Sequence, residues 1–522
     1  MSYTSFVYLF LFLPAVWALW AVLPQRGRPA VLLGASLLFY WLTSGRYIVW
    51  ILAAAAVTWG VGLLLGRLDD ILSTAKPELS AAGRKAVKKQ LAAAKSLAVG
   101  GGAAILLAVF LWLKYWPFAA RSIAAVLDRL PGALSLTVPS YTLPLGLSFV
   151  TLMAVGYLVD VHRGSCRPAR HYWQVLLFLC FWPHVVEGPF DRWDRLSGPL
   201  LDPPRPSYKN LTFGVQRIVW GLFKKMVIAD RANMYVKAVF DDYTQYSGMA
   251  VALGAVLYTL QLYAEFSGCM DIVLGSAECF GVPLAENFRQ PFFSRTVGEF
   301  WRRWHMTLGA WLREYLFQPL ILSAPWKTLG RFCRTRFGAA AGRSLPVWAA
   351  LGVTWAAIGW WHGAGWMYLL YGMYYYILQL LGEIAEPVWT ARFPGITALR
   401  KRRWYQALQM LRTFVLVLGG MLIFRSNGTL AAIAMFKSLA VPYTGSLLIK
   451  LDARDMAVLA AGAVLMLAVD LLHERGVAIR NTLARAPLPL RWAVYIGGVL
   501  LILVFGAYGD NYDPAGFIYA QF

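Results

Sequence analysis

The sequence has few charged residues for its length, and acidic residues are the scarcer kind. Only 14% of the 522 residues are charged, and 49 basic side chains against 26 acidic ones give a net charge of +23. A soluble chain of ordinary composition carries about a quarter charged residues. Apolar blocks of membrane-spanning length fill the chain instead, which indicates a polytopic membrane protein. The blocks lie at 6–22, 48–65, 97–112, 143–159, 249–264, 348–361, 414–424, 456–472 and 493–507.

Several familiar catalytic and binding motifs are missing. The sequence contains no Gly-x-x-x-x-Gly-Lys-Ser/Thr phosphate loop, no Gly-x-Ser-x-Gly nucleophile elbow and no His-Glu-x-x-His metal motif. The few cysteines show no paired spacing, so we expect no disulfide framework and no metal site. Soluble linkers are absent too, and we predict one membrane domain over 1–522. The cysteines are Cys166, Cys180, Cys269, Cys279 and Cys333.

The placement of the basic residues argues against nucleic-acid binding. They cluster between the apolar blocks, as the positive-inside rule expects. Threading the blocks between these clusters places the N-terminus and the C-terminal tail outside and the basic segment 67–96 in the cytoplasm. That segment suits either a basic helix on the membrane surface or a solvated helical loop. Anionic lipid is therefore the expected partner of most of these side chains, and nucleic acid is not.

Two histidines lie in aromatic, apolar sequence. His305 follows Phe300-Trp-Arg-Arg-Trp, and His362 lies within Gly359-Trp-Trp-His-Gly-Ala-Gly-Trp. A titratable imidazole at membrane depth is costly to bury, so each is a functional candidate. The structural alternative is a core histidine that is hydrogen-bonded to a carbonyl group.

His362 is the better candidate for proton transfer. Gly363 and Gly365 follow it, and glycines allow a substrate or another backbone segment to come close. A buried imidazole favours the neutral form, which can accept a proton as a general base. We therefore predict that this imidazole is uncharged and reachable from both faces of the membrane.

His305 has basic neighbours. A continuous helix would place Arg302 and Gly309 beside it. Arg302, Arg303 and the nearby Arg313 could bind a phosphate or a carboxylate of a substrate. They could equally pair with acidic side chains inside the bundle, and the sequence leaves both interpretations open.

Two further polar segments lie close to apolar blocks. Residues 178–193 contain two prolines, a glycine and two acids, which a straight span cannot hold; a re-entrant segment around His184 would tolerate them. Glu265 and Asp271 lie at near-membrane depth and need partners or a water-filled cavity. They could form ion sites in a transporter without covalent chemistry, although the two related halves common in transporters are not visible.

The histidine stretches together resemble the membrane-bound O-acyltransferase family. The first stretch runs from Glu286-Asn-Phe-Arg-Gln-Pro-Phe to Glu299-Phe-Trp-Arg-Arg-Trp-His-Met-Thr-Leu, and Trp361-His-Gly-Ala-Gly-Trp is similar to the family's second stretch. Shorter similarities extend over most of the chain. They include Leu143-Pro-Leu-Gly-Leu-Ser-Phe, Gly188-Pro-Phe-Asp-Arg, Phe424-Arg-Ser and Phe517-Ile-Tyr-Ala-Gln-Phe.

The resemblance implies an all-α fold, a ring of about 11 transmembrane helices with re-entrant and interfacial helices around a central tunnel. It implies that His362 is the essential histidine and that His305 is the second signature residue. We predict that the core motif region 286–366 also supplies substrate-binding residues. These are Asn287, Arg302, Arg303, Trp304, Trp361 and Trp366.

The resemblance also implies the reaction and its participants. An acyl group, acetyl in the branch that acetylates exported polysaccharides such as alginate, would pass from a cytoplasmic thioester to a hydroxyl group or to an extracytoplasmic acetyltransferase. Acetyl-CoA or an acyl carrier protein would be the donor, with no tightly bound cofactor, in a multi-pass protein of the bacterial inner membrane. The branch that transfers D-alanine to teichoic acids is the alternative.

Overall fold

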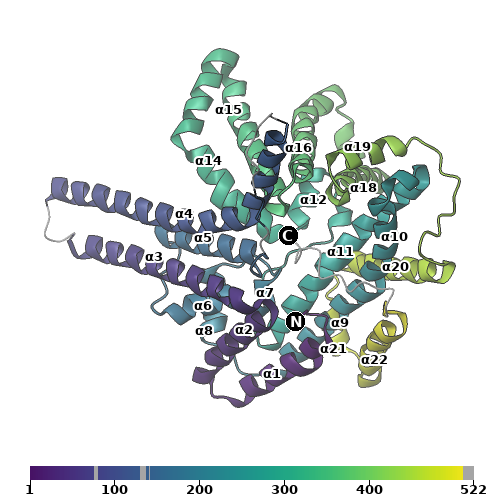
Figure 1. The fold of residues 1–522 in the computed structure, drawn as a ribbon, viewed down its shortest axis with the longest axis horizontal. Coiled ribbons are helices and arrows are strands. Elements are labelled where there is room, and N and C mark those ends of the chain that lie inside the picture. Colours follow the sequence, from purple (N-terminus) through teal and green to yellow (C-terminus); the bar gives the residue numbers. More distant parts are fainter. Residues whose placement is uncertain (76–79, 130–136, 140–141, 509–522) are drawn as a thin grey trace. The chain divides into compact units, whose positions relative to one another are not determined.

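The structure, a computed structural model, describes residues 1–75, 80–129, 137–139 and 142–508, and these residues are mostly helical (Figure 1). The backbone pairing of strand type in these ranges is one isolated bridge between Phe288 and Trp304. The predicted all-α fold is thus confirmed. Two compact units divide the chain: unit 1 is Met1–Val215 with Val273–Ala285, and unit 2 is Gln216–Ile272 with Glu286–Phe522.

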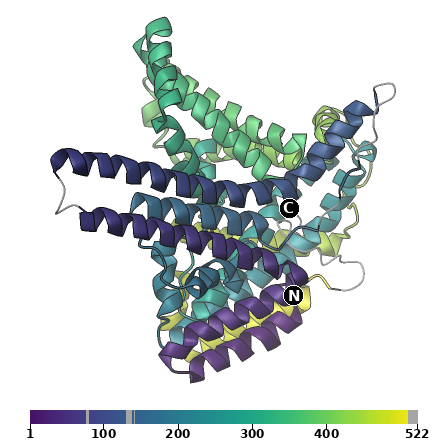
Figure 2. The same ribbon diagram turned by 60° about the vertical axis from the view of Figure 1, so that its left-hand side comes forward.

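Unit 1 is built around two long helices, α3 and α4, which lie side by side in Figures 1 and 2. Small residues allow close packing: a β-carbon on Gly62 would lie 3.0 Å from the Tyr157 hydroxyl oxygen of α5. The helices are η1 (Val7–Phe12), α1 (Leu13–Val22), η2 (Gln25–Gly27), α2 (Arg28–Ser44), η3 (Gly45–Tyr47), α3 (Ile48–Ala75), α4 (Ala81–Leu127), α5 (Leu147–Arg163), α6 (Tyr172–Cys180), α7 (Trp182–Val185), α8 (Trp193–Leu201) and the first half of α9 (Tyr208–Phe223).

The described residues of the basic segment 67–96 belong to the end of α3 and the start of α4, and whether they lie on a membrane surface stays a prediction. Ser80 caps α4, because its hydroxyl oxygen accepts the Gly83 N–H at 3.2 Å. Lys95 of α4 pairs with Asp69 of α3 at 2.7 Å. The basic side chains therefore lie on the ends of two paired helices, and their cytoplasmic location stays a prediction.

Residues 178–193 break into short pieces, as their prolines predict. α6 ends at Cys180, α7 covers four residues, and α8 begins at Trp193. His184 is fully buried, and its Nε2 atom lies 2.8 Å from the Phe178 carbonyl oxygen. This bond ties α7 back to α6, which supports the structural interpretation of His184.

Unit 2 contains the core motif region and the remaining helices. They are η4 (Lys224–Ala229), α10 (Asp230–Asp241), η5 (Tyr243–Gln245), most of α11 (Gly248–Cys279), η6 (Pro291–Phe293), α12 (Val297–Arg303), α13 (Met306–Leu312), η7 (Arg313–Phe317), α14 (Gln318–Leu322), α15 (Ala324–His362), α16 (Trp366–Arg392), α17 (Ile396–Leu399), α18 (Arg403–Arg425), α19 (Thr429–Ser438), α20 (Ala453–Glu474), α21 (Ile479–Arg485) and α22 (Leu488–Phe505).

Glycines let α15 and α16 pack at backbone contact. A β-carbon on Gly359 would lie 2.3 Å from the Tyr368 carbonyl oxygen, and one on Gly372 would lie 2.3 Å from the Trp355 carbonyl oxygen. No larger residue fits either position without moving a backbone. This close hairpin fixes the end of α15, where His362 lies.

A π-helical turn, η4, joins α9 to α10. Such turns widen the helix and occur often at functional sites. Two consecutive lysines, Lys224 and Lys225, are each only 5% exposed there. Both point inward, and each meets carboxylates: Lys224 pairs with Asp271, and Lys225 pairs with Asp230 and Glu265.

Six helical segments among the described residues are long and apolar enough to cross a membrane: Gln25–Ile71, Ala82–Leu127, Gly248–Cys279, Arg403–Arg425, Ala453–Glu474 and Leu488–Phe505. The blocks predicted at 143–159 and 348–361 fall on α5 and on the second half of α15, which are not among the six. The total of about 11 spans therefore stays a prediction. The predicted outer tail, 509–522, lies outside the described residues.

Candidate functional site

His305 lies at a break between two short helices. α12 ends at Arg303, α13 begins at Met306, and His305 has a left-handed backbone with φ of 47°. The expected continuous helix through His305 is therefore wrong on the side of Arg302, whereas the Gly309 N–H does donate to the His305 carbonyl oxygen at 3.2 Å, one helical turn away. The helix breaks here because residues 287–289 form backbone hydrogen bonds with residues on both sides of His305. The Met306 N–H donates to the Asn287 carbonyl oxygen at 2.9 Å, and the Arg289 N–H donates to the Arg303 carbonyl oxygen at 2.9 Å.

The Asn287 side chain sets the tautomer of His305. Its Oδ1 atom accepts the Thr307 backbone N–H at 3.2 Å and the Thr307 hydroxyl at 2.9 Å. A backbone N–H can only donate, so the accepting atom is the amide oxygen. The same oxygen lies 3.1 Å from His305 Nδ1, which must then carry the proton. A neutral His305 consequently presents Nε2 as its acceptor nitrogen.

Aromatic rings enclose the His305 imidazole. The Phe266 ring meets it edge to face with centroids 4.9 Å apart, and the Trp361 ring lies 5.6 Å away. The side chain is 3% exposed and lies outside the six candidate spans. Burial lowers the pKa of His305 to about 3, because desolvation disfavours the charged form. The imidazole is therefore neutral at ordinary pH.

His362 closes α15 and lies among three aromatic rings. Its ring centroid is 5.0 Å from that of Trp361, 5.7 Å from that of Tyr371 and 5.2 Å from that of Phe424. Trp361 thus contacts both imidazoles, which the structure brings to one place although 57 positions separate them. His362 is 3% exposed. The expectation that it is open to substrates is not met in this arrangement of side chains.

The turn after His362 is tight because Tyr368 folds back over it. A β-carbon on Gly363 would lie 2.1 Å from the Tyr368 ring, whereas one on Gly365 would be 3.5 Å away. The Gly365 N–H donates to the Gly363 carbonyl oxygen at 3.1 Å. Gly363 is extended, with φ of −175°, so steric room and not backbone conformation requires the glycine.

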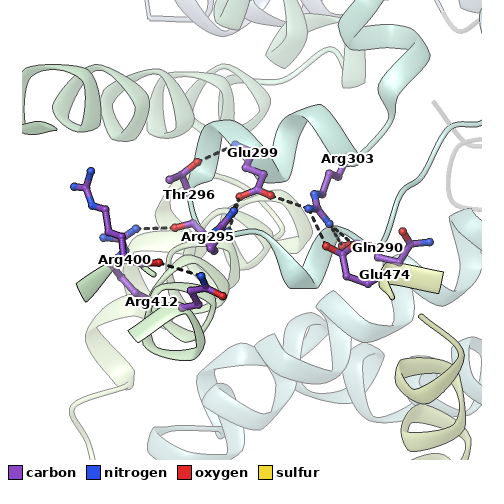
Figure 3. A network of polar contacts seen from close by, with 9 residues as sticks. Gln290, Arg295, Thr296, Glu299, Arg303, Arg400, Arg412 and Glu474 are labelled. Atoms are coloured by element: carbon purple, nitrogen blue, oxygen red, sulfur yellow. Dashed lines mark hydrogen bonds and ion pairs between the residues drawn. The ribbon is translucent and has the colours of Figure 1, made fainter. Parts of the chain in front are cut away.

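The predicted substrate-binding arginines have different surroundings. Arg303 donates to Glu299 at 2.8 Å and to Glu474 at 2.7 and 3.1 Å, and it bonds the Gln290 carbonyl oxygen at 3.4 Å (Figure 3). Arg303 is thus held in a network that joins α12 to α20. Arg302 is exposed.

The same network also fastens the start of α12. The Thr296 hydroxyl oxygen caps the helix by accepting the Glu299 N–H at 3.1 Å. Arg412 of α18 donates to the Arg295 carbonyl oxygen at 2.8 Å, as Figure 3 shows. The polar side of the motif is therefore anchored to two neighbouring helices.

The predicted tryptophans differ in exposure. Trp304 is 1% exposed and packs against Phe288, Phe300 and Tyr263 in an aromatic cluster. Trp366 is 60% exposed at the first position of α16. Trp361, at 8%, is the member that touches both histidines. Substrate roles for all three stay predictions.

The carboxylates considered for a transporter path are paired inside unit 2. Asp271 binds Arg217 at 2.9 Å and Lys224 at 2.6 Å, and Glu265 binds Lys225 at 3.0 Å. These contacts match each buried acid with a base, as burial of charge requires. No group of three potential metal ligands occurs among the described residues, and none of the five cysteines, all of them described, is in a disulfide.

Comparison with known proteins identifies the family. The model of MBOAT, the membrane-bound O-acyltransferase family, matches residues 170–333, a range that contains His305 and ends before His362. A probable alginate O-acetylase of Pseudomonas putida is 30% identical over 438 residues, which cover 84% of this chain and 79% of the relative. The chain belongs to the membrane-bound O-acyltransferase family.

Two further relatives represent the two branches of the family considered from the sequence. A probable alginate O-acetylase of Azotobacter vinelandii is 29% identical over 84% of this chain and 78% of its own length. A teichoic acid D-alanyltransferase of Bacillus subtilis is 26% identical over 54% of this chain and 68% of its own length. This membrane-bound O-acyltransferase is thus an enzyme of acyl transfer, and its membrane-integral character follows from the family.

Sequence reasoning missed several residues of the site. Thr307, Tyr371 and Phe424 contact Asn287 or His362, and none was assigned a role. Phe424 does fall within one of the fragments that resemble the family, so the resemblance carried a signal for it. Tyr371 carried none, because it is one of five tyrosines between residues 368 and 376.

Proposed function

We propose that this enzyme moves an acetyl group from a cytoplasmic thioester to a hydroxyl group of an exported polysaccharide, or to an extracytoplasmic transferase that completes the transfer. The observation that carries the proposal is the pair of buried imidazoles, His305 and His362, that share contact with Trp361. Acetyl is favoured over D-alanyl because the alginate relatives align over 84% of the chain and the D-alanyl relative over 54%.

In this proposal His362 acts as the general base. Its neutral imidazole accepts the proton of the acceptor hydroxyl while the hydroxyl oxygen bonds to the thioester carbonyl carbon. The carbon–sulfur bond then breaks, and the imidazolium returns the proton to the leaving thiolate. General base catalysis contributes about 10²–10⁴-fold. Since His362 is buried, substrate entry requires that neighbouring side chains move.

His305 has a second role in the proposal. Its Nδ1 proton is held by Asn287 Oδ1, so Nε2 is the atom that can accept a hydrogen bond from a substrate. We propose that His305 orients the reacting group. The proposed donor is acetyl-CoA or an acyl carrier protein, and we propose no resident cofactor. We further propose that the enzyme crosses the inner membrane of a bacterium several times.

The test compares His362→Gln with His473→Gln in purified protein mixed with labelled acetyl-CoA. His473 is exposed near the end of α20 and serves as a matched histidine control. We expect His362→Gln to reduce acetyl transfer at least about a hundred-fold while His473→Gln keeps it. If the folded His362→Gln protein transfers acetyl groups at the wild-type rate, His362 is not the general base.

The same assay separates the alternatives. Consumption of a D-alanyl carrier thioester in place of acetyl-CoA would favour the teichoic acid branch. Movement of an intact solute across vesicles, without consumption of any thioester, would support a transporter instead.

A further inference from the structure

A close approach of α9 and α11 sets up a charged network beside the motif. A β-carbon on Gly221 would lie 2.4 Å from the Gly268 carbonyl oxygen, so the two helices touch at glycine. Arg217 and Lys224 lie about one helical turn before and after Gly221 and therefore face α11. Lys224 donates to Ser267 at 2.8 Å and pairs with Asp271 at 2.6 Å.

Arg217 joins two carboxylates with three hydrogen bonds. Its Nε atom donates to Asp271 Oδ1 at 2.9 Å, and Nη1 and Nη2 donate to the two oxygens of Glu286 at 2.7 and 2.6 Å. The side chains of Arg217 and Asp271 are 15% and 14% exposed, and that of Glu286 is 56% exposed. Only a planar guanidinium can make this fork together with a third bond.

Glu286 precedes the residue that binds His305. The Asn287 side-chain N–H donates to Met270 Sδ at 3.4 Å, and Met270 is next to Asp271 in α11. The segment 286–287 is thereby fastened to α11 directly through Met270, and through Arg217 to the adjacent Asp271. Phe266, one turn earlier on α11, touches the His305 ring. One face of α11 thus supports Asn287 and His305 together.

We infer that Arg217 is a positioning residue for acyl transfer, which holds Glu286 against α11 and so sets the place of Asn287 and the orientation of His305. Arg217 contacts neither imidazole, and it acts through Glu286 and Asn287. The inference depends on the proposed role of His305 in the reaction. Its first test does not use the reaction at all.

That first test is chemical modification of His305 by diethyl pyrocarbonate, located by peptide mass spectrometry. The variants are Arg217→Lys and Glu286→Gln, and Arg231→Lys is the matched control. Arg231 is a buried arginine that pairs with Asp455 at 3.1 Å and bonds the Phe505 carbonyl oxygen, and these partners lie outside residues 286–307 in the sequence.

We expect modification of His305 to be about ten-fold faster in Arg217→Lys and in Glu286→Gln than in wild type. This factor corresponds to about 1.4 kcal/mol of local stability. Modification in Arg231→Lys should stay at the wild-type rate. Equal rates in all proteins would overturn the inference, whatever the enzyme's activity. Equal acceleration in Arg231→Lys would also overturn it, because the effect would then be general loosening of the fold.

The second test is a double-mutant cycle with acetyl-CoA as the donor. Arg217→Lys should lower kcat about ten-fold with little change in KM, since mispositioning affects the reacting geometry. In an Asn287→Ala background the same substitution should lower kcat no further. Additive losses would refute action through Asn287. If wild type consumes no acetyl-CoA, the proposed donor fails, while the modification result still decides the inference.

Discussion

The Tyr368 ring occupies the place where a β-carbon on Gly363 would stand, 2.1 Å from its nearest ring atom. Gly363 follows His362 directly, so any movement there shifts the histidine. We expect Gly363→Ala to lower the free energy of unfolding by about 1–3 kcal/mol, as overpacking does, and to reduce transfer. Thermal unfolding in detergent and the acetyl-CoA assay measure the two effects. Gly365→Ala, with 3.5 Å of room, is the control and should behave like wild type.

The two adjacent arginines of the motif should respond differently to truncation. Arg303→Ala removes bonds to Glu299 and Glu474, and we expect a loss of about 1–3 kcal/mol in unfolding free energy. Arg302→Ala should change stability by less than about 0.5 kcal/mol, because its side chain is exposed. If Arg302 binds the donor, its loss raises KM for acetyl-CoA instead. A stable Arg303→Ala enzyme with a raised KM would reverse these assignments.

Stability should depend on pH through His305. The pKa of His305 is about 3 in the folded protein and about 6.5 in the unfolded chain. Below 6.5 the unfolded state therefore binds more protons, and stability falls as the pH falls. Between pH 8 and pH 5, wild type should lose about 2 kcal/mol relative to His305→Gln. Denaturation of both proteins at the two pH values checks this; a constant difference would contradict it.

The loop after α5 offers a test of the predicted topology. Ser165 is exposed beside Arg163 and Arg167, which the positive-inside rule places in the cytoplasm. A Ser165→Cys, Cys166→Ala protein should react with a membrane-impermeant maleimide in inside-out vesicles and not in intact spheroplasts. Solubilised protein provides the full-labelling control. Labelling from the outer face would invert the predicted orientation.

The helical fold was predictable from composition and apolar blocks, whereas the break at His305 was not. No proline or glycine marks residues 303–306, so the pattern indicated one helix. The break depends on pairing with residues 287–289, a contact between segments that local sequence does not encode. The same limit applies to Arg303, whose partner Glu474 lies 171 positions away.

The two histidines were predictable as candidates from their settings and from the family resemblance, whereas their proximity was not predicted. Their common neighbour Trp361 was assigned to substrate, and its contact with both imidazoles emerged only from packing. The link from Arg217 to Glu286 was also hidden, because a lone arginine in an apolar stretch gives no sign of its partner. A buried charged side chain needs a partner of opposite charge, but the sequence does not show which residue that partner is.

The π-helical turn between α9 and α10 makes this part of the chain sensitive to length. Its wide turn accommodates more residues than an α-helical turn of the same rise. Removal of a single residue between Phe223 and Asp230 would let the turn relax to ordinary α-helix. Because the π turn holds one residue more than an α-helix of the same rise, α10 would keep nearly the same orientation relative to α9, and only the widened turn that carries Lys224 and Lys225 would be lost. An inserted residue that continued the helix would instead turn α10 by about 100° relative to α9, so these six positions should tolerate a deletion better than an insertion.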